Sequence, residues 1–188
     1  MARVADALEA SPMSLYRYFG DRDELAMAVT RHVLRSARRP LPPDVSWQDR
    51  VRAWMTAVYD QAIKHPQLFQ STASGESLAW LSEAAYLAGI LETAGFRDDR
   101  VLAEAVLWVG TATLGQAMVA AGMGEEVTTP RLYTALGRLS QEEARQVARL
   151  VPHFAAMGGT SFTHAADLTI AALATRLTDL RSHGPIEV

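Results

Sequence analysis

Residues 11 to 22 of this 188-residue chain combine small side chains with hydrogen-bond donors that suit the edges of a nucleic acid. Serine, tyrosine and arginine side chains donate to phosphate oxygens, and arginine also reads base edges in the major groove. Pro12, Met13 and Ser14 would leave the start of this segment narrow enough to enter that groove. Position along the segment then predicts two sets of contacts: Pro12, Met13 and Arg17 near base edges, and Ser11, Tyr16, Tyr18 and Arg22 toward phosphates. The alternative for the tyrosines is amphipathic packing.

Motifs of enzyme chemistry are missing from the rest of the sequence. There is no cysteine, and the five histidines form no H-E-x-x-H pair. There is also no G-x-S-x-G elbow, phosphate-binding loop or dinucleotide fingerprint. The sequence therefore predicts a protein that is not an enzyme and that holds no metal or other cofactor.

The donor-rich segment is expected to lie on the second of two short helices. Val4, Ala5 and Leu8 share one face of a first helix, residues 2–10, and Ser11-Pro12 supplies an N-cap and a proline at the first helical position. The second helix, residues 12–19, should end at Gly20. Asp21 and Glu24 have the spacing of a capping box for a third helix, residues 22–38. Two short helices joined by a tight turn are the components of a helix-turn-helix.

Prolines 40, 42 and 43 cannot continue the third helix, so they predict a junction between a head, residues 1–39, and a body, residues 46–182. The head holds seven arginines against five acids, and the remainder holds 11 bases against 16 acids. A net charge of −3 for the whole chain excludes a general polycation, so any nucleic-acid contact must come from a local patch.

The body is predicted to be helical as well, which makes the fold class all-α. Ser46 should cap a helix that buries Val51, Trp54, Met55, Val58 and Ala62 and ends before Pro66. Further helices are expected over residues 77–94, 99–122, 129–139, 140–151 and 161–182, with breaks at Pro152 and at Gly158-Gly159. We find no strand signal and no internal repeat.

Residues 105–124 contain no charged side chain, which reaches the length of a membrane span. Four glycines and several polar residues weaken its hydropathy, so a helix buried all round, in a core or a subunit interface, is the better interpretation. The N-terminus has no apolar secretion segment. The sequence thus predicts a cytoplasmic protein that does not insert into membranes.

The stretch ALEASPMSLYRYFGDRDEL, residues 7–25, resembles the signature of the TetR family of transcriptional regulators. The body is similar, more loosely, to the C-terminal domain of the tetracycline-repressor branch, in SWQDRVRAW and GFRDDRVLAEAVLWVGTATLGQ. The resemblance implies a ligand-responsive regulator, in most cases a repressor that a small-molecule inducer releases from double-stranded operator DNA. It also implies a homodimer formed through the helices 99–122 and 162–181, for which the alternative is a monomeric core.

Two departures from the family pattern lead to further expectations. The family has one more helix before the helix-turn-helix, so Val4, Leu8, Leu15 and Phe19 are expected to lack part of their apolar cover. We therefore expect either a start upstream of Met1 or a truncated product with weakened DNA binding. The alternative functions are a dimeric helical protein that binds small molecules without DNA, and a small helical enzyme. Residues 69–72 contain no histidine, which argues against a tetracycline-magnesium site.

Polar and aromatic side chains within apolar helix faces are the candidates for a ligand pocket in the body. They are Trp54, Tyr86, Trp108 and Gln116. The alternative for the aromatic residues is core packing, and Gln116 could instead pair across a dimer interface.

Overall fold

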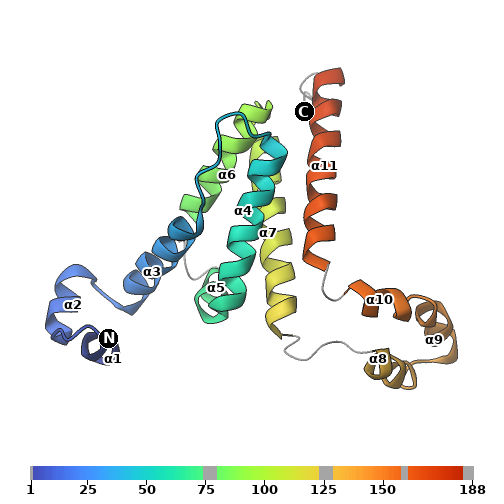
Figure 1. Ribbon diagram of the computed structural model, residues 1–188, viewed down its shortest axis with the longest axis horizontal. Helices are drawn as coiled ribbons and strands as arrows, with labels where there is room; N and C mark the ends of the chain where they lie inside the picture. The colour runs from blue at the N-terminus through green and yellow to red at the C-terminus, as the bar shows by residue number, and fades with distance from the viewer. Residues whose placement is uncertain (1, 74–79, 123–128, 158–160, 184–188) are drawn as a thin grey trace.

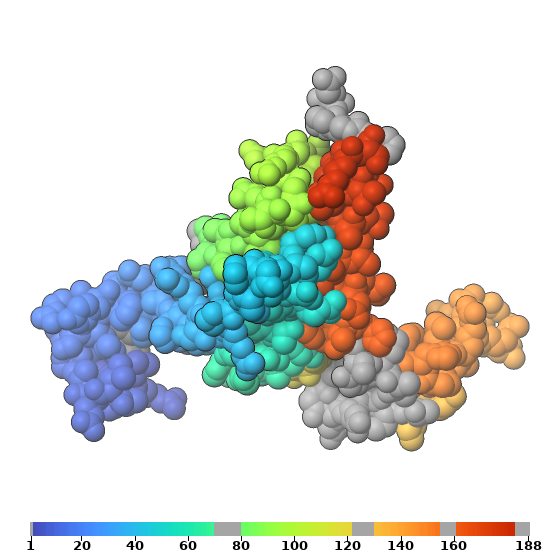
Figure 2. Space-filling view, turned by 45° about the horizontal axis from the view of Figure 1, so that its top comes forward, coloured from blue at the N-terminus to red at the C-terminus, as the bar shows by residue number. Residues whose placement is uncertain are grey.

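A computed structural model describes residues 2–73, 80–122, 129–157 and 161–183. Over these residues the chain forms eleven α-helices and no strand, which confirms the predicted all-α class. A bundle of α4–α7 and α11 forms the centre (Figure 1), and α1–α3 and α8–α10 project from it on different sides (Figure 2). The helices are α1 (Ala2–Ala7), α2 (Pro12–Tyr18), α3 (Arg22–Ala37), α4 (Trp47–Lys64), α5 (Pro66–Ala73), α6 (Leu81–Ala94), α7 (Asp99–Gly122), α8 (Thr129–Leu136), α9 (Gln141–Ala148), α10 (Val151–Met157) and α11 (Ser161–His183).

The turn between α1 and α2 begins earlier than the sequence predicted. Glu9 has a φ of 51°, and the Ala10 N–H donates to the Ala5 carbonyl at 2.9 Å, so α1 ends in a Schellman motif rather than at Ala10. The predicted cap of α2 is confirmed, because the Ser11 hydroxyl accepts from the Ser14 N–H at 3.1 Å. These two caps fix the direction in which α2 leaves α1.

The start of α3 follows the predicted capping box in one half only. The Asp21 carboxylate accepts from the Glu24 N–H at 2.7 Å, as expected. The Glu24 carboxylate accepts from the Gly20 N–H at 2.6 Å, one residue before the expected donor. Gly20 and α3 are thereby held together, which ties the end of α2 to the helix that leads into the body.

The helix α4 is the centre of the core and packs against α3, α5, α6, α7 and α11. The five apolar residues predicted for its inner face are all buried. Met55 and Val51 are fully buried, and they meet an equally inaccessible group from α6 and α7 that includes Leu87, Leu91 and Val109. Burial of this size is the main stabilising term of such a bundle.

The proline-rich junction is held against the start of α4 rather than left loose. Arg50 donates to the carbonyls of Val45, Pro42 and Pro43 at 3.1, 3.1 and 2.8 Å. Prolines lack N–H groups but keep their carbonyls, so a guanidinium with five donors suits this segment. The junction thus has a defined path from α3 to α4.

Two prolines lie in the first turns of helices that the sequence did not predict. The helix α4 ends before Pro66, as predicted, but Pro66 is also the first residue of the unpredicted α5, and Pro152, where a break was expected, is the second residue of α10. A proline in the first turn loses no hydrogen bond, because the first N–H groups of a helix have no partner in the helix. The expected start at Ser77 and the break at Gly158-Gly159 lie outside the described residues.

The capping box predicted for α9 is complete. The Ser140 hydroxyl accepts from the Glu143 N–H, and the Glu143 carboxylate accepts from the Ser140 hydroxyl at 2.6 Å and from its N–H at 2.9 Å. These hydrogen bonds, the side-chain one first, lower the pKa of Glu143 below its ordinary value of 4.5. A lowered folded-state pKa means that the cap stabilises α9 above pH 4.5 and weakens as the pH falls through the lowered value.

We expect Ser140→Ala to raise the pKa of Glu143 toward 4.5, because both the hydroxyl donor and the cap geometry are lost. An NMR titration of the Glu143 carboxyl carbon measures this shift. Ser182→Ala, a change at the far end of α11, is the control and should leave Glu143 unchanged. Titration of Glu143 at its ordinary value in the unaltered protein would contradict the capping box.

The helix α7, which has no charged side chain over residues 105–122, is not buried all round in a single chain, so of the two predicted surroundings the core alone does not account for it and the subunit interface stays a prediction. It packs against α4, α6 and α11 on one side. Three of its large apolar side chains are exposed, Leu107 by 55%, Trp108 by 60% and Val119 by 53%. Among the described residues, one stretch is long and apolar enough to cross a membrane by length and composition, Asp99–Ala121 of α7, and 28% of its most apolar window is buried.

The last helix, α11, is fastened to the core at both ends. Phe162 stacks on Tyr59 of α4 with ring centroids 3.9 Å apart, and burial, with a smaller contribution from Asp60, raises the pKa of Tyr59. At the other end Arg181 donates to the Ala94 carbonyl at 3.0 Å, where α6 stops at Gly95 in a left-handed conformation with φ 117°. The outward side of α11 exposes Leu168 by 72%.

Candidate functional site: the α2 surface and the cavity of the body

The structure brings the predicted nucleic-acid-binding residues together on the surface of α2 and its flanks. Met13 is 78% exposed, Tyr18 69% and Tyr16 48%, and Leu15 alone among the α2 residues is buried. Ser11, Pro12, Arg17 and Arg22 are also exposed, and Ser14 is half-buried. The tyrosines therefore do not pack into the core, and their hydroxyls remain available to a partner.

Four of these side chains form two pairs within the chain. Arg17 donates to the Tyr18 hydroxyl at 3.2 Å, and its guanidinium lies 5.2 Å from the centre of the Tyr18 ring. The Ser11 hydroxyl caps α2 and lies 2.8 Å from the Ser14 hydroxyl. Tyr18 thus holds Arg17 on the outer surface, whereas the role of Ser11 in the structure is to start the helix.

An apolar groove lies behind this surface, between α1 and the start of α3. Val4 is 39% exposed, Leu8 62% and Val29 39%. The expected lack of cover is therefore confirmed for Val4 and Leu8, but it is wrong for Leu15, which is 92% covered because α1 packs against α2. Phe19 is half-buried. The groove is lined by Arg3, Val4, Ala7, Leu8, Arg22, Leu25 and Val29.

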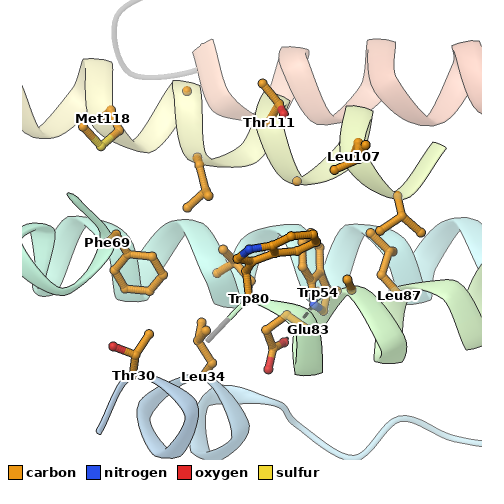
Figure 3. Close-up of a pocket in the computed structure, with 16 residues that line it drawn as sticks. Thr30, Leu34, Trp54, Phe69, Trp80, Glu83, Leu87, Leu107, Thr111 and Met118 are labelled. Carbon is orange, nitrogen blue, oxygen red and sulfur yellow. Dashed lines mark hydrogen bonds between the residues drawn. The ribbon is translucent and has the colours of Figure 1, made fainter. Parts of the chain in front are cut away.

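A cavity of about 390 Å³ lies between α3 and the body helices α4, α5, α6 and α7 (Figure 3). This volume is within the range of small-molecule sites. Its wall is mostly apolar and aromatic, and Glu83 is the one charged side chain among the described residues that line it. The lining comprises Thr30, Leu34, Trp54, Val58, Phe69, Trp80, Glu83, Ala84, Leu87, Val106, Leu107, Gly110, Thr111, Leu114, Gly115 and Met118.

Glu83 joins the cavity to the end of α3. The side chain is 4% exposed, and its carboxylate accepts from the Trp54 indole N–H at 3.0 Å, a contact seen in Figure 3. It also accepts from Arg38, the C-cap residue of α3, through Nη2 and through Nε at 3.2 Å. Arg38 in turn lies 4.0 Å from the centre of the Tyr86 ring. A buried carboxylate is tolerated here because three donors and an opposite charge compensate it.

Of the four predicted pocket residues, Trp54 lines the cavity and the other three do not. Tyr86 lies under Arg38, Trp108 is 60% exposed and outside the cavity lining, and Gln116 accepts from the Ser161 hydroxyl at 3.0 Å. Sequence reasoning missed Trp80 and Glu83. A carboxylate within the apolar helix α6 was the signal that could have found Glu83.

Among the described residues, no group of three or more His, Asp or Glu side chains is arranged to hold a metal ion. The cavity lining contains no histidine, and Glu83 is already paired with Arg38. The candidate sites are therefore a surface of hydrogen-bond donors on α2 and an apolar cavity with one carboxylate.

Comparison with solved structures identifies the arrangement of a helix-turn-helix head on a helical body with a cavity as the TetR-family fold. The chain is similar to a possible TetR family transcriptional regulator from Streptomyces coelicolor A3(2), with 23% identity and a TM-score of 0.64 over 96% of this chain and 88% of that one. It is also similar to BioQ of Mycobacterium smegmatis, with 24% identity and a TM-score of 0.59 over 92% and 84% of the two chains.

A structure of BioQ with its natural double-stranded DNA operator matches as well, with 24% identity and a TM-score of 0.50 over 82% of this chain and 84% of that one. No model of a protein family and no curated protein matches the sequence. The fold expected from the sequence resemblance is confirmed by these structures.

Proposed function

We propose that the chain is a DNA-binding transcriptional regulator of the TetR type, not an enzyme, with residues 1–39 as the DNA-binding head and residues 46–182 as the ligand-binding and dimerisation body. The observation that carries this proposal is the exposed surface of α2, where Met13, Tyr16, Arg17 and Tyr18 all face outward. The likeness to BioQ, whose structure contains operator DNA, supports it. In this proposal α2 enters the major groove, and Pro12, Met13 and Arg17 lie near base edges.

The cavity supports control by a small molecule. Thr30 and Leu34 of α3 form part of its wall, so a bound molecule would touch the helix that follows the helix-turn-helix. Suppose that α3 can take two positions relative to the body and that the ligand binds one of them more tightly. The ligand then shifts the population of head orientations by the difference between its affinities for the two conformations. We propose that the protein without ligand represses by occupying its operator, and that ligand binding releases it and ends the repression.

A homodimer through α7 and α11 is the third part of the proposal. Outside the cavity these helices expose Trp108, Val119 and Leu168, three large apolar side chains that a second copy would cover in a four-helix contact. Two recognition helices must lie roughly 34 Å apart to meet successive major grooves, and a dimer sets that distance.

Fluorescence anisotropy of the chain with its own upstream intergenic DNA and with an unrelated duplex tests the function. At two salt concentrations, we expect a preference for the intergenic DNA and a steep loss of affinity as salt rises. The loss is expected because protein binding releases counterions from the DNA phosphates, and a higher salt concentration opposes that release. Equal binding to both duplexes at each salt concentration would refute operator recognition. It would favour instead a helical small-molecule-binding protein.

Arg17→Ala is expected to weaken operator binding by about 1 to 3 kcal/mol and to relax the choice of sequence, if Arg17 reads a base edge. Arg35→Ala, on the exposed side of α3, is the control, because it removes the same charge outside α2. Anisotropy with the operator and with single-base variants measures both effects. A uniform loss for every duplex would show that Arg17 contacts a phosphate instead.

A further inference from the structure

The cavity of the body has an electrostatic character that restricts its ligand. Among the described residues that line it, Glu83 is the single charged one, and Trp54, Trp80 and Phe69 place aromatic rings around the same space. Figure 3 shows the Glu83 carboxylate beside Trp54, with Trp80 on the same wall. Aromatic faces and a carboxylate both attract cations, whereas a ligand carboxylate would meet a like charge in a poorly hydrated space.

The carboxylate also retains the capacity to accept a further hydrogen bond. A carboxylate has about four acceptor positions. The described residues supply three donor atoms to it, Arg38 Nη2, Arg38 Nε and Trp54 Nε1. Arg38 is absent from the cavity lining, so a molecule inside the cavity meets the negative partner of this ion pair and not the positive one.

We infer that the cavity selects an apolar molecule with one protonated amine, that the amine binds Glu83, and that this contact weakens the hold of Glu83 on Arg38. The inference rests on the proposed ligand-binding role of the body. An ammonium group at Glu83 competes with Arg38 for the same charge and repels the guanidinium, so the two contacts oppose each other. Because Arg38 is the C-cap residue of α3, binding of the ligand's amine to Glu83 would change the contacts at the C-terminal end of α3, the helix that follows the helix-turn-helix.

Matched ligand pairs test the selectivity without DNA. The probes are naphthylmethylamine with naphthoic acid, and adamantylmethylamine with adamantanecarboxylic acid, each titrated calorimetrically into the full chain. We expect at least one amine to bind about tenfold or more tightly than its acid, as a charge-assisted hydrogen bond would give. Equal affinities within both pairs, or no binding of either amine at millimolar concentration, would overturn the inference.

Glu83→Gln keeps the size of the side chain and its ability to accept from Trp54 while removing the charge. This variant should lose the preference for the amine, with its helicity and melting temperature checked by circular dichroism. Glu92→Gln is the matched control, because Glu92 lies on the exposed side of the same helix. A preference for the amine that survives Glu83→Gln would assign it to another group and overturn the role of Glu83.

The coupling to the head is measured separately, as the ratio of operator dissociation constants with and without saturating amine. We expect a ratio of about five or more in the unaltered protein and a ratio near one in Glu83→Gln. An amine preference with a ratio of one in the unaltered protein would overturn the coupling through Arg38. Operator binding without any amine preference would refute this inference and leave the proposed regulator standing, so the two failures are distinguishable.

Discussion

Glutamate in place of Leu168 is expected to convert the protein from a dimer to a monomer. Leu168 is 72% exposed on α11, so the substitution costs little in a single chain. In the proposed dimer each copy would contribute one carboxylate at this position, so that two carboxylates would lie in the apolar contact. At roughly 2 kcal/mol for each unpaired buried charge, a lower bound, the dimer dissociation constant should rise by about a thousandfold. Light scattering during gel filtration measures the result, a change from twice the chain mass of 20.5 kDa to that mass itself.

The control for this change is Leu81→Glu, an exposed leucine at the first position of α6. An acidic residue in the first turn of a helix is compatible with the helix dipole, and α6 is outside the proposed contact. This variant should remain a dimer. A dimer that persists in Leu168→Glu, or a monomer in the unaltered protein at micromolar concentration, would contradict the assignment of α11 to the interface.

Removal of the Phe96 ring is expected to cause the largest loss of folding stability. Phe96 is fully buried in the turn between α6 and α7, so Phe96→Ala leaves a cavity in the core as well as removing apolar contacts. We expect the free energy of unfolding to fall by about 3 to 5 kcal/mol, a large part of the stability of an ordinary domain. Urea denaturation followed by circular dichroism, at one fixed protein concentration, measures this difference.

Phe154→Ala is the control, because it removes the same phenyl ring from a position that is exposed to solvent. Phe154 is 47% exposed on α10, and its loss should cost less than about 1 kcal/mol. Similar losses for the two variants would show that Phe96 is not enclosed as the structure describes.

The sequence predicted what depends on short spacing and missed what depends on distant partners. Helix caps and the inner face of a helix depend on residues within a turn or two of one another. The structure confirms the predicted caps at Ser11, Ser46 and Ser140 and the predicted inner face of α4. The starts of α5 and α10 were missed because Pro66 and Pro152 are compatible with either the end or the beginning of a helix.

The cavity could be predicted only in part, because five helices contribute to it. Trp54 and Trp108 look alike in the sequence, yet Trp54 lines the cavity and Trp108 is exposed outside its lining. Glu83 has its partner, Arg38, 45 residues away, and no local pattern indicates that pair. Residues in a site assembled from several elements are fixed by tertiary packing, which single-helix periodicity does not describe.

The helix α6 makes one hydrogen-bonded contact near each of its ends, and these two contacts limit how its length can change in evolution or in design. Its first turn holds Arg38 through Glu83, and its last carbonyl, that of Ala94, holds Arg181 of α11. One residue inserted between these points would rotate one end against the other by about 100° and lengthen the helix by about 1.5 Å, so both contacts could not persist. Related chains should therefore exchange the side chains that line the cavity freely while keeping the number of residues in α6 constant.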